Sequence, residues 1–305
     1  MKIAFGTIVL NGNNTYKETL KTIYPYASQI LIAEGPVKYW QEHGYTTSTD
    51  GTNELIDNFP DPENKIKIVH SQYEEKLQQT NAYMEHINDD IDYLWNLDSD
   101  QVFKAEDIEK VIKLLEDSDM TYTMVTFKSL SFFGGFNDYL TGFEEKAKFP
   151  GLFRVYPGSR WSAHRYPKMA HEQTPLPNKV LDSDVLASEH GIRIYHYSYV
   201  FADHIHQKAR YYREYVGALG AASKKNKGRN TIMLDYFDKI WLPWVVGNDM
   251  KRVMIETKYR GVHEFIPEKR GDCFTTKFKG SHPKEIQDNM TELMDKFNSQ
   301  LGKYT

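Results

Sequence analysis

The chain has 305 residues, enough to bury a sizeable core in one large domain or in a core with an appended part. Its formal net charge of −4 gives it no overall positive field, which argues against nucleic acid as a partner. The single cysteine, Cys273, excludes an intramolecular disulfide and any metal cluster built from several cysteines.

The first residues, "MKIAFGTIVLNG", form an apolar run of strand length that ends in turn residues. They lack the longer apolar core and the cleavage site of a signal peptide. No stretch reaches 18 apolar residues, so we expect no membrane span. These observations predict a cytoplasmic protein.

Strand-like and helix-like segments alternate through the first hundred residues. Short apolar runs predict buried strands at 2–10, 29–35, 65–70 and 92–97. Apolar residues at helical spacing predict helices at 15–27, 52–59 and 71–87, and a turn at Ser48–Thr52 precedes the second of these. Such alternation favours an α/β fold, with a mostly parallel sheet and helices on both faces.

The pattern is less regular after a helix predicted at 105–117. Strand-like runs follow at 121–133, 151–162 and 192–200, and a helix is predicted at 203–222. The remainder mixes a basic loop at 223–229 with an aromatic-rich helix at 236–246. We therefore predict a core domain at 1–221 and a mainly helical extension at 222–305, which packs on the core or forms a contact between copies of the chain.

Two carboxylates, Asp98 and Asp100, follow the fourth predicted strand. Along a regular strand, residues i and i+2 lie on the same face of the sheet. Where the strand gives way to a turn, their two side chains can converge. Converging carboxylates suit a hard divalent cation such as Mg²⁺ or Mn²⁺, and ligands of parallel sheets bind beyond the carboxyl ends of the strands. An acidic turn that starts a helix is the alternative interpretation.

The segment "IDYLWNLDSDQVF" resembles the strand and Asp-X-Asp turn of nucleotide-sugar glycosyltransferases with the A-type (GT-A) fold. Further motifs resemble family 2 of these enzymes in the same order along the chain: Glu34 at a strand end, the Ser48–Thr52 turn "STDGT", His171-Glu172, and His196 in "IYHYSYV". The resemblance covers residues 1 to about 215. It implies a Rossmann-like GT-A domain.

The resemblance implies a role for each matching residue. Asp100 and His196 would hold Mn²⁺ or Mg²⁺, with Asp98 contacting the ribose or the metal, and Glu172 would be the catalytic base. The remaining candidates would contact the nucleotide sugar: Thr7, Glu34, Asp50, Asn81, Asp98 and Arg154. The implied activity is an inverting transfer of a sugar from a nucleotide-diphosphate donor to a hydroxyl of a glycan or other acceptor.

The chain departs from the family pattern at three places. Residues 35–47 separate Glu34 from the Ser48–Thr52 turn, Thr80-Asn81 replaces an Arg-Asn pair, and Ser198 replaces the glycine of His-Tyr-Gly-Tyr. These departures affect the identity of the base and sugar more than the type of reaction.

Other interpretations remain open. Asp50 could be only a helix cap. Further candidates for the base are Asp138, Asp182 and Asp184. The aromatic pair Tyr39-Trp40 could close over the sugar, although packing at the surface is expected. The basic run 224–229 could meet the diphosphate or an anionic acceptor, although a solvated loop is expected. His263-Glu264 is expected to be structural. A nucleotidyltransferase or phosphohydrolase could use the same carboxylates, although "FFGGF" is too short for a phosphate loop, and a non-catalytic sugar-nucleotide-binding relative is the third alternative.

Overall fold

The structure is a computed structural model, and it describes residues 1–164, 167–172, 177–212, 214, 236–247 and 275–305. Contacts within the chain divide it into two compact units. Unit 1 consists of Met1–Lys128, Lys148–Ile194 and His282–Asp288, and unit 2 of Ser129–Ala147, Tyr195–Ser281 and Asn289–Thr305. The boundary expected between residues 221 and 222 lies outside the described residues and stays a prediction.

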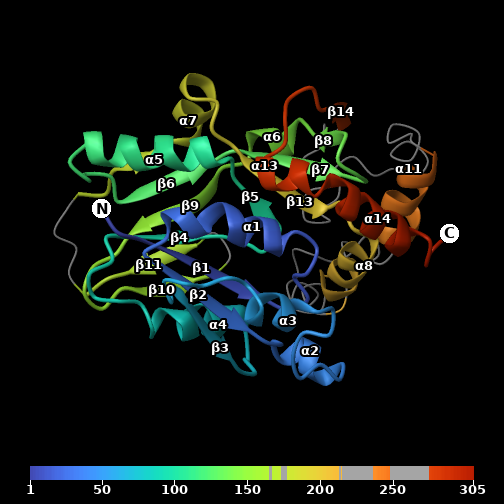
Figure 1. Ribbon diagram of the computed structural model, residues 1–305, viewed down its shortest axis with the longest axis horizontal. Helices are drawn as coiled ribbons and strands as arrows, with labels where there is room; N and C mark the ends of the chain where they lie inside the picture. Colours follow the sequence, from blue (N-terminus) through green and yellow to red (C-terminus); the bar gives the residue numbers. More distant parts are fainter. Residues whose placement is uncertain (165–166, 173–176, 213, 215–235, 248–274) are drawn as a thin grey trace, which may run out of the picture. The chain divides into compact units, whose positions relative to one another are not determined.

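A seven-stranded sheet forms the centre of unit 1, in the order β12-β6-β9-β4-β1-β2-β3 (Figure 1). Its strands are β1 (Ile3–Val9), β2 (Gln29–Glu34), β3 (Ile66–His70), β4 (Tyr93–Asn96), β6 (Met124–Phe127), β9 (Phe149–Arg154) and β12 (Val180–Leu181). Strand β1 pairs in parallel with β2 and with β4, and β2 pairs in parallel with β3. Only β9 is antiparallel, between β4 and β6.

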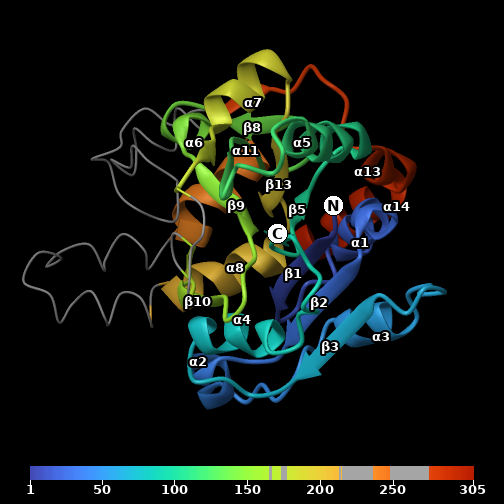
Figure 2. The same ribbon diagram turned by 90° about the vertical axis from the view of Figure 1, so that its left-hand side faces the viewer.

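Helices cover both faces of this sheet. In Figure 2, α4 lies on one side of β1 and β2, and α1 and α5 lie on the other. The helices of unit 1 are α1 (Tyr16–Ile23), α2 (Lys38–Glu42), α3 (Thr52–Asp57), α4 (Lys76–Met84), α5 (Ala105–Asp117), α7 (Ser183–Glu189) and α13 (Lys284–Asp288). The predicted α/β fold, a mostly parallel central sheet flanked by helices, is confirmed.

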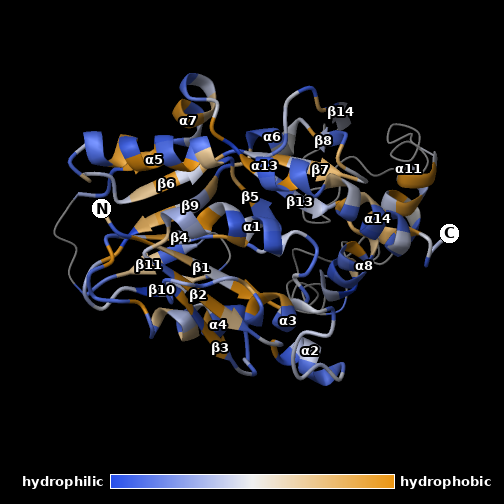
Figure 3. Ribbon diagram, in the orientation of Figure 1, coloured by the Kyte–Doolittle hydropathy of each residue, from blue (hydrophilic) through white to orange (hydrophobic). Residues whose placement is uncertain are grey.

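Helix α5 shows why the periodicity predicted it well. Ile108, Val111 and Leu115 are fully buried on one side of the helix, and hydrophilic and hydrophobic residues alternate along it (Figure 3). Burying side chains of this size contributes about 1.5–3 kcal/mol each. Glu106 and Asp107 lie in the first turn, where negative charge interacts favourably with the helix dipole.

The core beneath α1 and α5 is built on aromatic rings. The ring of Trp95 stacks between those of Phe5 and Phe127, at centroid distances of 5.5 and 5.3 Å. On the opposite face Gly6 lets α4 approach β1, because a Cβ at residue 6 would lie 2.8 Å from the ring of Tyr83. A hairpin of β10 (Arg160–Ala163) and β11 (Lys168–Ala170) packs on α4.

Unit 2 has a sheet with the strand order β14-β8-β7-β13. Its strands are β7 (Ser129–Phe133), β8 (Asp138–Leu140), β13 (Ile194–Tyr199) and β14 (Thr275–Lys277), and its helices are α6 (Phe143–Lys146), α8 (Ala202–Tyr211), η4 (Tyr236–Trp241), α11 (Leu242–Gly247) and α14 (Met290–Leu301). The indole Nε1 of Trp241 donates to the Tyr199 carbonyl at 2.8 Å, which ties η4 to β13.

The described part of the predicted extension, 236–247 and 275–305, contains four helices and strand β14. Within the described residues, every helix is too short or too polar to cross a membrane. The predicted cytoplasmic location and the contact between copies stay predictions.

Candidate active site

The acidic turn predicted to bind a metal follows β4. Because β1, β2 and β4 are parallel neighbours, their carboxyl ends share one edge of the sheet. Gly6 of β1 pairs with Asn96 of β4, and Val9 pairs with Glu34 of β2. The segments that follow these strands therefore start from the same edge.

Asp98 and Asp100 lie in a turn between β4 and the short strand β5 (Gln101–Val102). The backbone N–H of Gln101 donates to the Asp98 carbonyl at 3.0 Å, and the Gln101 side-chain amide donates to Asp98 Oδ2 at 3.3 Å. Helix α1 holds the turn from behind, since the hydroxyl of Thr19 donates to the Gln101 carbonyl at 3.2 Å. The two carboxylates therefore lie in a turn, where their side chains can converge, and not on a continuous strand.

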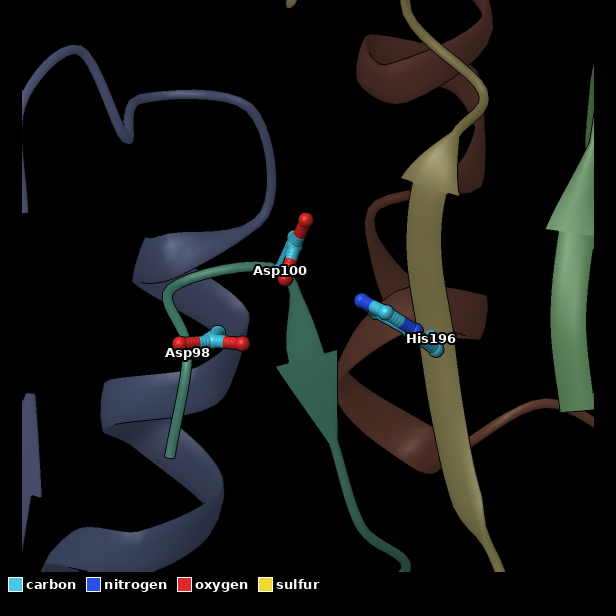
Figure 4. Close-up of side chains that lie close together, drawn as sticks. All are labelled: Asp98, Asp100 and His196. Atoms are coloured by element: carbon cyan, nitrogen blue, oxygen red, sulfur yellow. The ribbon is translucent and has the colours of Figure 1, made fainter. Parts of the chain in front are cut away.

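Asp98 and Asp100 of unit 1 and His196 of unit 2 each offer one possible ligand atom for a metal ion (Figure 4). His196 comes from β13 and is only 9% exposed. Carboxylate oxygens suit Mg²⁺ and Mn²⁺, and an imidazole nitrogen is a common ligand of transition metals. The donor set fits a divalent cation, and the side chains are the three that the sequence predicted as metal ligands.

Glu34 ends β2 with its side chain buried, at 1% exposure. Its carboxylate accepts hydrogen bonds from the Ser48 N–H at 2.7 Å and from the Thr47 hydroxyl at 3.0 Å. The ring Nδ1 of His70 lies 3.1 Å from Glu34 Oε2. Glu34 therefore fixes the point at which the 35–47 insertion returns to the core.

Asp50 organises the turn that precedes α3. Its Oδ1 accepts from the N–H of Thr52, two residues on, at 3.1 Å, as in an Asx turn, and its Oδ2 accepts from the N–H of Asn13 at 2.9 Å, while Gly51 is the N-cap of α3. The Thr52 hydroxyl in turn accepts from the N–H of Gly12 at 2.8 Å. Gly51 has a φ of +88°, a conformation that favours glycine, and a Cβ there would lie 2.8 Å from Asn13 Nδ2.

This turn is locked onto the segment that follows β1. Asn11 accepts from the Thr49 N–H at 2.8 Å through its side-chain oxygen, and its own N–H donates to the Ser48 hydroxyl at 2.9 Å. Asn11 is 7% exposed and has a φ of +58°. The "LNGNN" turn residues are the signal by which this contribution could have been found.

Three further predicted nucleotide contacts have other observed surroundings. Thr7 is 1% exposed within β1. The side-chain amide of Asn81 donates to the Trp161 carbonyl at 3.0 Å and accepts from the Trp161 N–H at 2.9 Å, so it holds β10 against α4. Arg154 pairs with Tyr93, the first residue of β4, and its guanidinium donates to the Met120 carbonyl. It therefore lies at the opposite end of β4 from Asp98.

Glu172, the predicted base, lies against a tight turn. Gly158 has a φ of +71°, and a Cβ there would lie 2.7 Å from Cδ of Glu172. The turn closes through the Ser159 N–H and the Tyr156 carbonyl at 3.0 Å, with a proline and a glycine between them, as a type II turn requires. An added side chain at residue 158 would displace the carboxyl group.

The same turn holds the neighbouring histidine. Ser159 Oγ accepts from the Tyr156 N–H at 2.8 Å and lies 2.7 Å from His171 Nδ1. Burial lowers the pKa of His171, which favours the neutral imidazole. Burial, with the nearby charge of Lys76 as a smaller cause, lowers the pKa of His164 to about 3. Ser159 was not predicted, although "YPGS" is a recognisable turn sequence.

The other candidate bases form ion pairs. Asp138 contacts Lys277 at 2.8 Å, and Asp182 caps α7 by accepting from the Asp184 N–H at 2.8 Å. Hydrogen bonds from Lys128 and Lys148 lower the pKa of Asp184 to about 2, which leaves it a weak base at neutral pH. The basic run 224–229 and the pair His263-Glu264 lie outside the described residues.

Residues 46–170 match the model of glycosyl transferase family 2. The matched segment begins just before the Ser48–Thr52 turn and includes Asp98 and Asp100, and it ends before Glu172 and His196. It confirms the resemblance to family 2 glycosyltransferases that the motifs indicate. No curated protein sequence matches the chain.

The chain is also similar to solved structures of S. aureus TarS. TarS 1-349 in complex with UDP-GlcNAc is 14% identical, with a TM-score of 0.32, over 43% of this chain and 35% of that one. The complex of TarS 1-349 with UDP is 12% identical, with a TM-score of 0.34, over 50% of this chain and 47% of that one. The chain therefore spans less than half of these structures.

Proposed function

We propose that this protein is a metal-dependent, inverting glycosyltransferase that moves a sugar from a nucleotide-diphosphate donor to a hydroxyl group of a glycan or other acceptor. The observation that carries the proposal is the turn that holds Asp98 and Asp100 after β4, at the carboxyl edge of the parallel strands and within the segment that matches glycosyl transferase family 2. Acidic turns are common in proteins, but two acids at this edge and in this sequence context favour a metal-diphosphate site.

Asp100 and His196 would hold the cation, Mn²⁺ or Mg²⁺, with Asp98 beside it on the nucleotide side. The bound cation would supply positive charge against the negative charge that develops on the leaving diphosphate. The turn that carries both carboxylates is fixed by Gln101 and by the Thr19 hydroxyl, so these ligands are held before the donor binds.

The nucleotide would bind beside the loops that follow β1 and β2. Glu34 and Asp50 both accept hydrogen bonds from their own chain, so we assign them to holding the 45–52 segment in shape. A nucleotide would then meet the backbone and hydroxyl groups that these carboxylates position. Thr7, Asn81 and Arg154 also have structural roles, and the proposal does not require them to contact the donor directly.

Glu172 is the proposed base. The acceptor hydroxyl oxygen would attack the anomeric carbon while the bond to the diphosphate breaks, and the hydroxyl proton would pass to the Glu172 carboxylate. Its position over Gly158 restricts the side chain on one side, and the Ser159–His171 hydrogen bond fixes the residue that precedes it. Such restriction favours one orientation of the carboxylate.

The proposal is tested by turnover of a panel of nucleotide sugars. The panel contains uridine, guanosine, cytidine, thymidine and adenosine diphosphate sugars. With Mn²⁺ or Mg²⁺ present, we expect release of a nucleoside diphosphate from at least one donor, and its loss when EDTA is added. Failure to bind or cleave any donor with either metal contradicts the proposal.

A further inference from the structure

Strand β13 presents two different faces. Tyr195 and Tyr197 lie on one of them, where both rings stack on the ring of Phe132, at 6.3 and 5.0 Å between centroids. Side chains alternate along a strand, so His196 and Ser198 share the opposite face, about 7 Å apart along the strand. This face therefore carries both the proposed metal ligand and the serine that replaces the family's glycine.

Ser198 is fully buried, and its hydroxyl accepts a hydrogen bond from the ammonium group of Lys208 on α8. The same ammonium lies 5.2 Å from the centroid of the Tyr199 ring, within the range of a cation–π interaction. Lys208 is neither fully buried nor fully exposed. The serine therefore provides an anchor for a lysine that a glycine at residue 198 could not provide.

Lys208 differs from the neighbouring cationic side chains, which form ion pairs with carboxylates. Arg210 on the same helix pairs with Glu214 at 3.4 Å, and Lys303 pairs with Asp203 at 2.5 Å. Among the residues that the structure describes, Lys208 has no carboxylate within ion-pair distance. A partly buried ammonium group loses hydration, and a bound anion would compensate for that loss.

We propose that Lys208, anchored by Ser198, binds the diphosphate of the nucleotide-sugar donor. This inference rests on the proposed function, because that function places a diphosphate at the cation held by His196, on the same face of β13. A lysine ammonium is a common phosphate ligand, and it would donate a charge-assisted hydrogen bond to a non-bridging phosphate oxygen. Ser198 and the Tyr199 ring would hold the ammonium in place before the ligand arrives.

The test is calorimetric titration of the full chain with Mn²⁺ and three probes: UDP, inorganic pyrophosphate and uridine. Lys208→Met should weaken the binding of UDP and of pyrophosphate about tenfold and leave uridine unaffected. Arg210→Met is the matched control, and it should stay within about twofold of the wild type. Ser198→Gly, which restores the family's residue, should have a smaller effect, about threefold, because Lys208 keeps its charge and loses its anchor.

Salt dependence separates a ligand contact from a structural role. Binding of pyrophosphate should weaken less steeply with rising salt in Lys208→Met than in the wild type, because one ionic contact is missing. Lys208→Arg keeps the charge and should keep part of the affinity, and it serves as the second variant if Lys208→Met does not fold.

The outcomes distinguish the inference from the function on which it rests. Equal pyrophosphate and UDP affinities in Lys208→Met, Arg210→Met and the wild type overturn the role of Lys208. If the wild type still releases a nucleoside diphosphate from a donor, the proposed function stands without it. A wild type that binds neither pyrophosphate nor UDP also overturns the inference, and turnover of the donor panel then decides the function separately.

Discussion

The two ends of strand β4 carry charged residues of different kinds. At the carboxyl end, Asp98 and Asp100 lie in a turn, and both belong to a group of possible metal ligands. At the amino end, Arg154 donates to the Met120 carbonyl, and its guanidinium carbon lies 5.6 Å from the ring centroid of Tyr93. The charge at the amino end is used to hold the backbone, whereas the charges at the carboxyl end are gathered where a ligand of a parallel sheet would bind.

This difference teaches that a charged residue beside a functional strand is not by itself a functional residue. The Met120 carbonyl accepts hydrogen bonds from the Tyr93 hydroxyl at 3.2 Å and from the Arg154 guanidinium. Arg154 is the charged donor of the two. The direction of the strand, more than the identity of the side chain, separates the two roles.

The largest effect on the rate of sugar transfer is expected from a substitution at the carboxyl end of β4. Asp100→Ala removes a proposed ligand of the cation, and we expect the rate of sugar transfer to fall about 1,000-fold, or about 4 kcal/mol in transition-state stabilisation. Initial-rate measurements at saturating Mn²⁺ check this, with circular dichroism to confirm folding. Asp117→Asn, at an exposed acid of α5, is the control. Near-normal turnover by Asp100→Ala would contradict the functional role assigned to the carboxyl end of β4.

Glu172→Gln should have the next largest effect. The amide cannot accept the acceptor's proton, so kcat should fall about 100- to 1,000-fold while the affinity for the donor stays unchanged. Steady-state kinetics, combined with donor titration, separate the two parameters. Asp184→Asn tests the alternative base, and its ion pairs with two lysines predict little change in kcat. The assignment of Glu172 as the base is wrong if Asp184→Asn loses kcat and Glu172→Gln does not.

Arg154→Met tests the amino end of β4. It leaves the Met120 carbonyl without its charged donor, and we expect a loss of about 1–3 kcal/mol in the free energy of unfolding. Donor affinity should stay within about twofold of the wild type. Urea denaturation and donor titration measure the two quantities. Normal stability with weakened donor binding would return Arg154 to the nucleotide site.

Asp107, near the start of α5, is a second charged residue with a structural role and can be compared with Asp98 and Asp100. Burial, opposed by the weaker influence of Lys110, raises its pKa to about 6. A carboxyl whose folded pKa is raised stabilises the fold most below pH 4, and this stabilisation is lost as the pH rises through about 6. The free energy of unfolding of Asp107→Asn minus that of the wild type should therefore increase by about 1–3 kcal/mol from pH 4 to pH 7.

Urea denaturation of both proteins at pH 4 and at pH 7 checks this prediction. The Asp107→Asn difference should change with pH, whereas that of Asp117→Asn should stay nearly constant. Equal changes for the two variants would mean that Asp107 titrates normally.

Local patterns in the sequence predicted much of the fold. The periodicity of 105–117 matches α5 residue for residue, and the apolar run 65–70 overlaps β3 closely. The position of Asp98 and Asp100 after a buried strand was also readable, because strand alternation places such residues at the carboxyl edge. His196 could be proposed only through the family resemblance, since one histidine on a strand carries no sign of its partners.

Contacts between distant segments account for what was missed. The run 121–133 was read as one strand, but it contains β6 and β7, which belong to different units. The Ser48–Thr52 turn locks onto Asn11–Asn13, and Asn81 holds the backbone of Trp161, through hydrogen bonds across 37 to 80 residues. No local pattern encodes such partners. Ser198 was recognised only as a departure until α8 placed Lys208 against it.

The binding of Mn²⁺ in the presence of UDP, measured by electron paramagnetic resonance, tests the central claim most directly. The account predicts one Mn²⁺ bound per wild-type chain, with tighter binding when UDP is present, and a loss of this binding in Asp100→Ala that Arg154→Met does not share. Equal Mn²⁺ binding by the wild type and Asp100→Ala, with or without UDP, would contradict it.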